Sequence, residues 1–284
     1  MAGVVIAVVA RRRAGSRRTE SAEPIATATS NAALQWDSLV TPAFTLYAQR
    51  GGYAADRLPE LRSEVDSAIT HALEILGEPG YRAHLRVFYV RSREDVKAVT
   101  GMAGMGITRA AYNAVVLVAA DTSRPAHRHE VMHAVSLRLW GQPGATPGDP
   151  REPSNAAVFY RGGWLREGLA TTADKGCVPW SVRGIAAQMV AENERIPLDT
   201  LTAAFYQKDG LSAYLQGGSL VQFLLLAYGR DRFKRLWHLG ADSIAAVYGK
   251  PSATIEAEWL GWLKATPEAE RPPSLAAVRG PGCK

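Results

Sequence analysis

Residues 129–133 read H-E-V-M-H, a pattern that places two imidazoles and a carboxylate within one short stretch of chain. Residues four apart on an α-helix lie about one turn apart, so His129 and His133 would project from the same face. Two imidazoles with this spacing can bind one tetrahedral metal ion and leave room for a third ligand and a water molecule. Glu130 would lie about 100° around the helix, where it can take a proton from that water instead of binding the metal.

The residues that flank this pattern predict that its helix is buried. The apolar neighbours are Val131, Met132, Ala134, Val135, Leu137 and Leu139. The alternative is a solvated helix on which two histidines and a glutamate merely share a face. Unpaired imidazole and carboxylate groups are costly in a buried helix, and one metal ion would satisfy all three. The apolar context therefore favours a metal site.

A second motif supplies a third ligand. Residues 164–170 read W-L-R-E-G-L-A, and their glutamate, Glu167, follows His133 by 34 residues. A glutamate on a later helix can complete a His2Glu zinc site whose fourth position stays open for catalysis. The small residues Gly168 and Ala170 predict that this helix packs closely against the helix of the first motif. The alternative is an ordinary first-turn glutamate, favoured there by the helix dipole.

Together, residues 129–133 and 164–170 resemble the motifs of the gluzincin metallopeptidases, which include thermolysin, aminopeptidase N and the peptidase MA-like domains. The resemblance implies one Zn²⁺ per chain, a peptide or protein substrate and hydrolysis of peptide bonds. The implied zinc ligands are His129, His133 and Glu167. Glu130 would be the general base, which takes a proton from water and later passes it to the leaving amine.

A third segment, residues 213–224, is similar to the Tyr-x-Lys-Gly segment of aminopeptidase N relatives. By that match the hydroxyl of Tyr214 would stabilise the tetrahedral transition state, because a phenol donor binds a developing oxyanion better than a ground-state carbonyl. The alternative is a core aromatic residue at the start of an amphipathic helix. The resemblance extends over residues 42–264.

The chain also departs from the family's pattern. Glu167 lies farther from the first motif than is usual, and the intervening Gly- and Pro-rich stretch at 141–150 reads as an inserted loop near the cleft. Arg166 stands where those relatives often have asparagine, and Thr171 stands where thermolysin has an aspartate. Asp174 is the nearest acidic residue that could orient a ligand histidine.

The exopeptidase signature Gly-x-Met-Glu-Asn is absent, and the comparable residues 104–107 contain no acid. The whole stretch 101–120 lacks a carboxylate that could hold a free amino terminus, and Arg109 within it would repel one. An internal peptide needs no such anchor, because its backbone can pair with an edge strand near 114–118. The sequence therefore predicts an endopeptidase rather than an aminopeptidase.

Charge gives no support for a nucleic-acid partner. The formal net charge of the 284 residues is +6, but half of it comes from the first 23 residues, which carry five arginines and two glutamates. Elsewhere basic and acidic residues are interspersed, as on a solvated surface.

The N-terminus does not fit a simple targeting signal. The apolar run at 3–10 precedes its arginines instead of following them, and it is too short to span a bilayer. Membrane association or an extracytoplasmic location would require this run to be part of a longer leader; otherwise we expect a cytoplasmic protein. Cys177 and Cys283 are too few for a disulfide framework.

The resemblance implies an α+β catalytic domain of the gluzincin and thermolysin type, which we place at 34–266. It comprises an α/β lobe with a mainly antiparallel sheet (34–125) and a helical lobe (126–266), between tails at 1–33 and 267–284. Strands are predicted at 43–49, 85–90 and 111–120. Helices are predicted at 59–76, 181–194, 198–207, 213–228, 230–239, 242–249 and 252–265. The resemblance implies that the last strand before the first motif is an edge strand above the zinc.

Two other functions remain open from the sequence. One is a non-catalytic binding module on the same scaffold, although a purely structural zinc site would not need Glu130. The other is a zinc hydrolase of a non-peptide amide or epoxide, because the same site could activate water against either. Among the other histidines, His127 is expected to have a capping or surface role.

Overall fold

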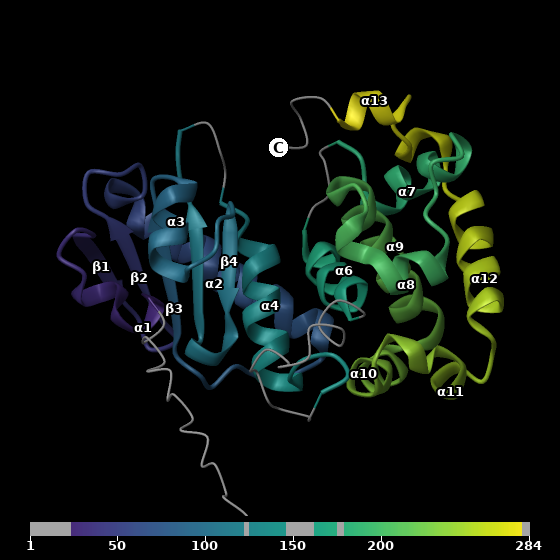
Figure 1. The fold of residues 1–284 in the computed structure, drawn as a ribbon, viewed down its shortest axis with the longest axis horizontal. Helices are drawn as coiled ribbons and strands as arrows, with labels where there is room; N and C mark the ends of the chain where they lie inside the picture. The colour runs from purple at the N-terminus through teal and green to yellow at the C-terminus, as the bar shows by residue number, and fades with distance from the viewer. Residues whose placement is uncertain (1–23, 122–124, 146–161, 175–178, 280–284) are drawn as a thin grey trace, which may run out of the picture.

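The computed structural model describes residues 24–121, 125–145, 162–174 and 179–279. These residues form a lobe that contains a sheet and a lobe made of helices (Figure 1). The two lobes meet where helices α4 (His127–Trp140) and α6 (Gly163–Ala173) pack together. The apolar run at 3–10, residues 146–150 of the predicted loop, Cys177 and Cys283 lie outside the described residues.

The sheet has five strands in the order β1-β2-β3-β5-β4. The strands are β1 (Trp36–Val40), β2 (Phe44–Gln49), β3 (Leu85–Val90), β4 (Gly106–Arg109) and β5 (Ala114–Val118). The prediction of a mainly antiparallel sheet is wrong, because β2, β3 and β5 are parallel and only the outer pairs are antiparallel. Helix α2 (Leu58–Leu76) carries the chain back between β2 and β3, and such a crossover makes strands parallel. The α+β class is confirmed.

The predicted position of the edge strand is also wrong. Strand β5 lies between β3 and β4, and all five of its residues are buried. The edge belongs to β4, a four-residue strand that forms a hairpin with β5 and is only partly buried. A strand covered on both faces reads as a continuous apolar run, as 114–118 does, so its composition fits an internal position.

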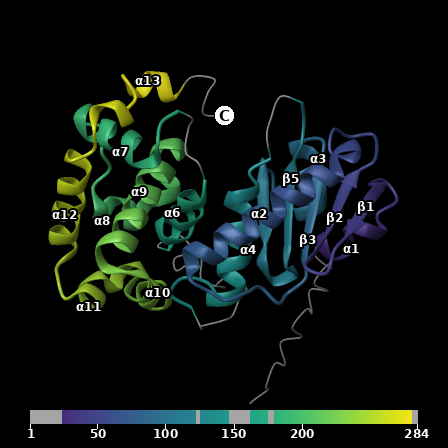
Figure 2. The same cartoon turned by 180° about the vertical axis from the view of Figure 1, so that it is seen from behind.

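Helices cover both faces of the sheet. Figure 1 shows α3 (Arg93–Thr100) on the near side, and Figure 2, seen from behind, shows α2 crossing in front of the strands. The alternation of β3 follows this division: Val87 and Tyr89 pack in the core with α2 and α4, whereas Phe88 and Val90 pack in the core with α3.

The helical lobe is built around α9 (Gly210–Tyr228), which packs against α6, α7, α10 and α12. The surrounding helices are α7 (Val182–Ala191), α8 (Leu198–Ala204), α10 (Arg230–Leu239), α11 (Ile244–Tyr248) and α12 (Ser252–Lys264). Among the described helices, α9 is long and apolar enough to cross a membrane, but 61% of its most apolar window is buried inside the protein. Its contacts are those of a core helix.

The close approach predicted for Gly168 occurs with a different helix from the one expected. A Cβ atom added to Gly168 would lie 2.6 Å from the carbonyl oxygen of Gly217, which belongs to α9. The absence of a side chain at Gly168 therefore lets α6 approach α9 rather than α4.

The described parts of the predicted tails are ordered against the domain. Helix α1 (Pro24–Thr27) buries Ile25 in the core on the α3 side of the sheet. Helix α13 (Leu275–Val278) buries Leu275 and Val278 in a cluster with residues of α7. These apolar side chains gain free energy by leaving water.

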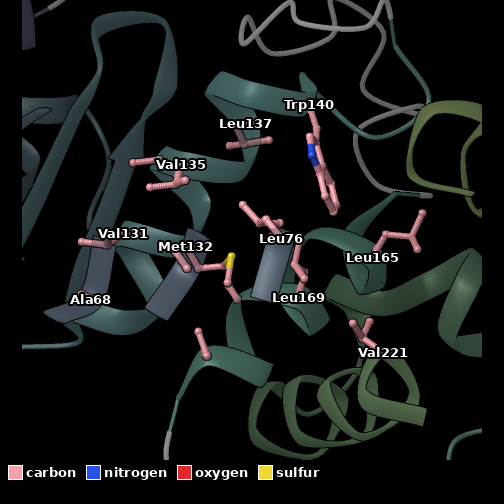
Figure 3. Close-up of a cluster of buried hydrophobic side chains, with 14 of the residues drawn as sticks. Ala68, Leu76, Val131, Met132, Val135, Leu137, Trp140, Leu165, Leu169 and Val221 are labelled. Atoms are coloured by element: carbon pink, nitrogen blue, oxygen red, sulfur yellow. The ribbon is translucent and has the colours of Figure 1, made fainter. Parts of the chain in front are cut away.

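Helix α4 is held in place by the core that it shares with both lobes (Figure 3). Its Val131 and Val135 belong to the same buried cluster as α2, and the ring of Trp140 packs at 5.7 Å from that of Trp237 in α10. The indole of Trp140 also donates a hydrogen bond to Glu78 at 2.8 Å. Burial of each large apolar side chain contributes about 1.5–3 kcal/mol to the stability of the fold. These contacts therefore fix the position of α4 and of the side chains that project from it.

The described start of the predicted loop is tied to α10. The Trp237 indole donates to the carbonyl oxygen of Gly141 at 2.9 Å, and the amide of Gly144 donates to the carbonyl of Trp237 at 2.8 Å. These bonds attach residues 141–145 to the helical lobe.

Candidate metal centre

Three side chains from two helices converge on one point. His129 and His133 project from α4, and Glu167 projects from α6. Glu167 Oε2 lies 3.0 Å from His133 Nε2 and 3.4 Å from His129 Nε2, and the two Nε2 atoms are 3.1 Å apart. Zinc bonds of about 2.0–2.1 Å in a tetrahedron place ligand atoms roughly 3.3 Å from one another. The three atoms are therefore spaced as ligands of one zinc ion would be.

The hydrogen bonding around His129 also fits a metal ion. Its Nδ1 lies 3.2 Å from Oδ2 of Asp174, which follows the last residue of α6. When Nδ1–H donates to that carboxylate, Nε2 keeps a lone pair that points at His133 Nε2 and at the Glu167 oxygen. Three polar atoms this close together are spaced for a positive charge between them, either a proton on an imidazole or a metal ion. Asp174 thus contacts the ring of His129, the histidine that the sequence suggested it could orient.

His133 differs in this respect. Its Nδ1 atom is buried and has no hydrogen-bond partner among the described residues. Because one nitrogen of this buried imidazole has no partner, the free energy of burying the ring depends on what its other nitrogen, Nε2, binds.

The electrostatics of the cluster favour positive charge. Burial lowers the pKa of His129, but hydrogen bonds to Asp174 and Glu167 outweigh burial and raise this pKa to about 10. Burial raises the pKa of Glu167, but the charge of His133 and the hydrogen bonds to both histidines bring this pKa well below its usual value. The carboxylates thus attract a cation to this point, which is what a metal site requires.

Glu130 lies outside the three converging groups and is held by the edge strand. The hydroxyl of Thr108, in β4, lies 2.7 Å from Glu130 Oε2 and can donate to it. A Cβ atom added to Gly106, also in β4, would lie 2.6 Å from Glu130 Oε1. One residue of β4 thus bonds the carboxylate and another makes room for it, as suits a base that acts beside a metal without binding it.

Tyr214 lies against the first histidine. Its ring stacks on that of His129 with centroids 5.9 Å apart and an interplanar angle of 22°, and it also packs against Phe205. Burial and then the negative charge of Glu167 raise the pKa of Tyr214 above its usual value. The phenol therefore stays protonated at neutral pH and can act as a donor.

Sequence reasoning missed two residues that contact Glu167. The hydroxyl of Tyr206 donates to Glu167 Oε1 at 2.8 Å, and the Nε atom of Arg166 lies 3.2 Å from the same oxygen. The sequence distinguishes Arg166 only because gluzincins often have asparagine at this position. Tyr206 lies 39 residues after Glu167, in the short 3₁₀ turn Phe205–Gln207, and has no motif around it that could have pointed to the site.

The role predicted for His127 is wrong. This side chain is buried, its Nε2 lies 2.7 Å from the hydroxyl of Tyr89 in β3, and its Nδ1 lies 2.8 Å from Glu64 in α2. It fastens the first turn of α4 to the sheet and to α2, because both of its ring nitrogens find partners there. No local sequence signal indicated these partners.

Comparison with known proteins gives little. No protein-family model matches the chain, and no curated protein matches it. Among solved structures it is similar to an aminopeptidase N family protein from Idiomarina loihiensis, with a TM-score of 0.38 and 16% sequence identity. The match covers 83% of this chain and 44% of that one, so the chain spans less than half the length of that protein. A likeness at this level establishes neither a family nor an activity.

Proposed function

We propose that this chain is a zinc-dependent hydrolase of the gluzincin type that cleaves peptide bonds. The observation that carries the proposal is the convergence of His129, His133 and Glu167, with the carboxylate of Glu130 held beside them by β4. Among the described residues no fourth histidine, cysteine or acid joins the group. Structural zinc sites close with four protein ligands, whereas catalytic sites keep three and leave one position open.

The residues around the site have separable tasks in such a reaction. A zinc ion held there would supply Lewis acidity, which polarises a carbonyl and lowers the pKa of water towards about 7. Glu130 would accept the proton of the attacking water and return it to the leaving amine. Thr108 would keep the carboxylate of Glu130 in place, and Asp174 would keep His129 turned towards the ion.

Tyr214 is proposed as the donor to the developing oxyanion, because its ring lies on His129 and its phenol stays protonated. Tyr214→Phe removes one hydroxyl and keeps the stacking. We expect kcat to fall by about 10²–10³-fold with little change in KM, as for the loss of other oxyanion donors. Steady-state kinetics on a cleaved peptide would measure both constants. A rise in KM alone would show that the hydroxyl contacts the ground state instead.

The free edge of β4 is the proposed place for the substrate backbone. Within the described sheet β4 pairs with β5 alone, and its residues Gly106 and Thr108 contact the carboxylate of Glu130. A peptide that adds to this edge would lie beside the base. The proposed pairing region is therefore 106–109 instead of 114–118.

The test of this function is digestion of one peptide in free-amine and N-acetylated forms by the zinc-loaded protein. Because residues 101–120 offer no carboxylate to hold an amino terminus, we expect cleavage of both forms at the same internal bond and at similar rates. Loss of cleavage on acetylation would make the enzyme an aminopeptidase. Failure to cleave either form while zinc is bound would favour a binding module or a hydrolase of another substrate.

A further inference from the structure

Both oxygens of the Glu167 carboxylate are engaged, but by different kinds of group. Oε2 faces the Nε2 atoms of the two histidines, where the ion would bind. Oε1 accepts the hydroxyl hydrogen of Tyr206 at 2.8 Å and lies 3.2 Å from the Arg166 guanidinium. Each carboxylate oxygen has two lone-pair sites, and these two donors occupy both sites on Oε1. The arrangement therefore opposes two-oxygen binding by Glu167.

The two donors on Oε1 also hold each other. Arg166 donates from its Nη2 atom to the hydroxyl of Tyr206, so guanidinium, phenol and carboxylate form a closed ring of hydrogen bonds. The side chains of Arg166 and Glu167 are largely buried, at 11% and 8% exposure. Charge-assisted hydrogen bonds in such a setting are stronger than neutral ones, and their geometry is well defined.

The absence of a side chain at Gly163 makes room for the ring of Tyr206. A Cβ atom added to Gly163, the first residue of α6, would lie 2.7 Å from the ring of Tyr206 and 3.1 Å from that of Phe205. The ring of Tyr206 also packs edge-on against Phe205, with centroids 5.0 Å apart. The position of the phenol is thus fixed by α6 on one side and by the turn before α9 on the other.

We infer that Arg166 and Tyr206 are positioning residues that restrict Glu167 to binding the metal through Oε2 alone. This inference rests on the proposed function only for the presence of the metal. With one oxygen committed to the clamp, defined here as Arg166 and Tyr206, the protein contributes three donor atoms and leaves coordination positions for water and substrate. Without the clamp, Glu167 can rotate, and Oε1 can take one of those positions.

Tyr206→Phe is the first test, because it removes one hydroxyl and keeps the ring. Since outer-shell partners of metal ligands are each worth about 10–100-fold in affinity, we expect a loss of zinc affinity in that range. Competition with a chromophoric chelator measures it. X-ray absorption at the zinc edge should show changed zinc–oxygen distances in the variant, because Oε1 of Glu167 would replace a water molecule at the metal. Tyr228→Phe is the matched control, because that hydroxyl bonds to Glu258 of α12 and should leave both readouts unchanged.

Gly163→Ala supplies an independent test that leaves the clamp residues unaltered. Its methyl group would displace the ring of Tyr206, so zinc affinity should fall as it does in Tyr206→Phe. In the double variant Gly163→Ala/Tyr206→Phe the two losses should not add, because both remove the same hydrogen bond. Fully additive losses would mean that the alanine acts through general damage to the lobe and would contradict the assignment.

Unchanged zinc affinity and unchanged coordination in Tyr206→Phe would overturn the clamp. Neither readout requires a substrate, so the result is separable from the fate of the peptidase proposal. A protein that binds zinc with the expected dependence on Tyr206 but cleaves nothing would keep the clamp and lose the proposed function. Arg166→Met extends the test to the second donor, with circular dichroism to verify that the variant folds.

Discussion

Glu167→Ala is expected to lower zinc affinity by more than about 100-fold, since loss of an outer-shell partner alone costs about 10–100-fold. The substitution removes the candidate ligand on α6 and the negative charge that would balance an ion. It also leaves the buried guanidinium of Arg166 without its carboxylate, which can destabilise the fold. Titration against a chelator of known affinity would measure the change.

Glu167→Gln separates loss of the ligand from loss of the fold. The amide keeps the size of the side chain and a carbonyl oxygen for the donors of Tyr206 and Arg166, but it removes the charge. Its zinc affinity should also fall, whereas Glu258→Gln on α12 should have no effect on it. Zinc affinity that remains at the wild-type value in both Glu167 variants would show that another residue is the third ligand.

Glu130→Gln is expected to lower turnover by about 10²–10⁴-fold, the usual range for loss of a general base. Glutamine has the shape of glutamate and so fits beside Gly106, where there is no room for a larger group. Because Glu130 is not one of the converging ligands, the variant should bind zinc like the wild type. The measurement is kcat for a cleaved peptide, with zinc content determined on the same sample.

Thr108→Val should reduce turnover in the same direction but by less. A hydrogen bond to a charged group is worth about 1.5–3 kcal/mol, which corresponds to roughly 10- to 100-fold in rate if the bond is needed in the transition state. Thr108→Ser, which keeps the hydroxyl, should be close to the wild type. Turnover of Glu130→Gln at the wild-type rate would remove Glu130 from the mechanism, whatever Thr108→Val shows.

The parts of the site that sequence could predict are those that depend on local geometry. His129 and His133 share a face because a helix places residues four apart on neighbouring turns, and this holds before any tertiary structure is known. The helices were predictable for a similar reason: the apolar period sets them, and α10 begins and ends at the expected residues, 230 and 239. Glu167 was predictable because it lies in the motif at 164–170. Asp174 was predictable because it follows Glu167 by about two turns of the same helix.

The parts that sequence could not predict depend on contacts between distant segments. Thr108 lies 22 residues before Glu130, and Tyr206 lies 39 residues after Glu167, so neither pair has a spacing that a helix or strand would impose. Strand direction was misjudged for the same reason, because alternation within β2 or β3 gives no sign of how α2 connects them. A strand of four residues such as β4 gives too short a pattern to recognise, yet it forms the edge of the sheet.

The most direct test of a catalytic zinc site is digestion of an unbiased peptide library by the zinc-loaded protein, with products identified by mass spectrometry. We predict about one zinc per chain, cleavage at internal bonds, loss of cleavage when a chelator removes the metal and recovery when zinc is returned. Cleavage that persists in the metal-free protein, or one bound zinc per chain without hydrolysis of any peptide, would contradict the proposed zinc peptidase.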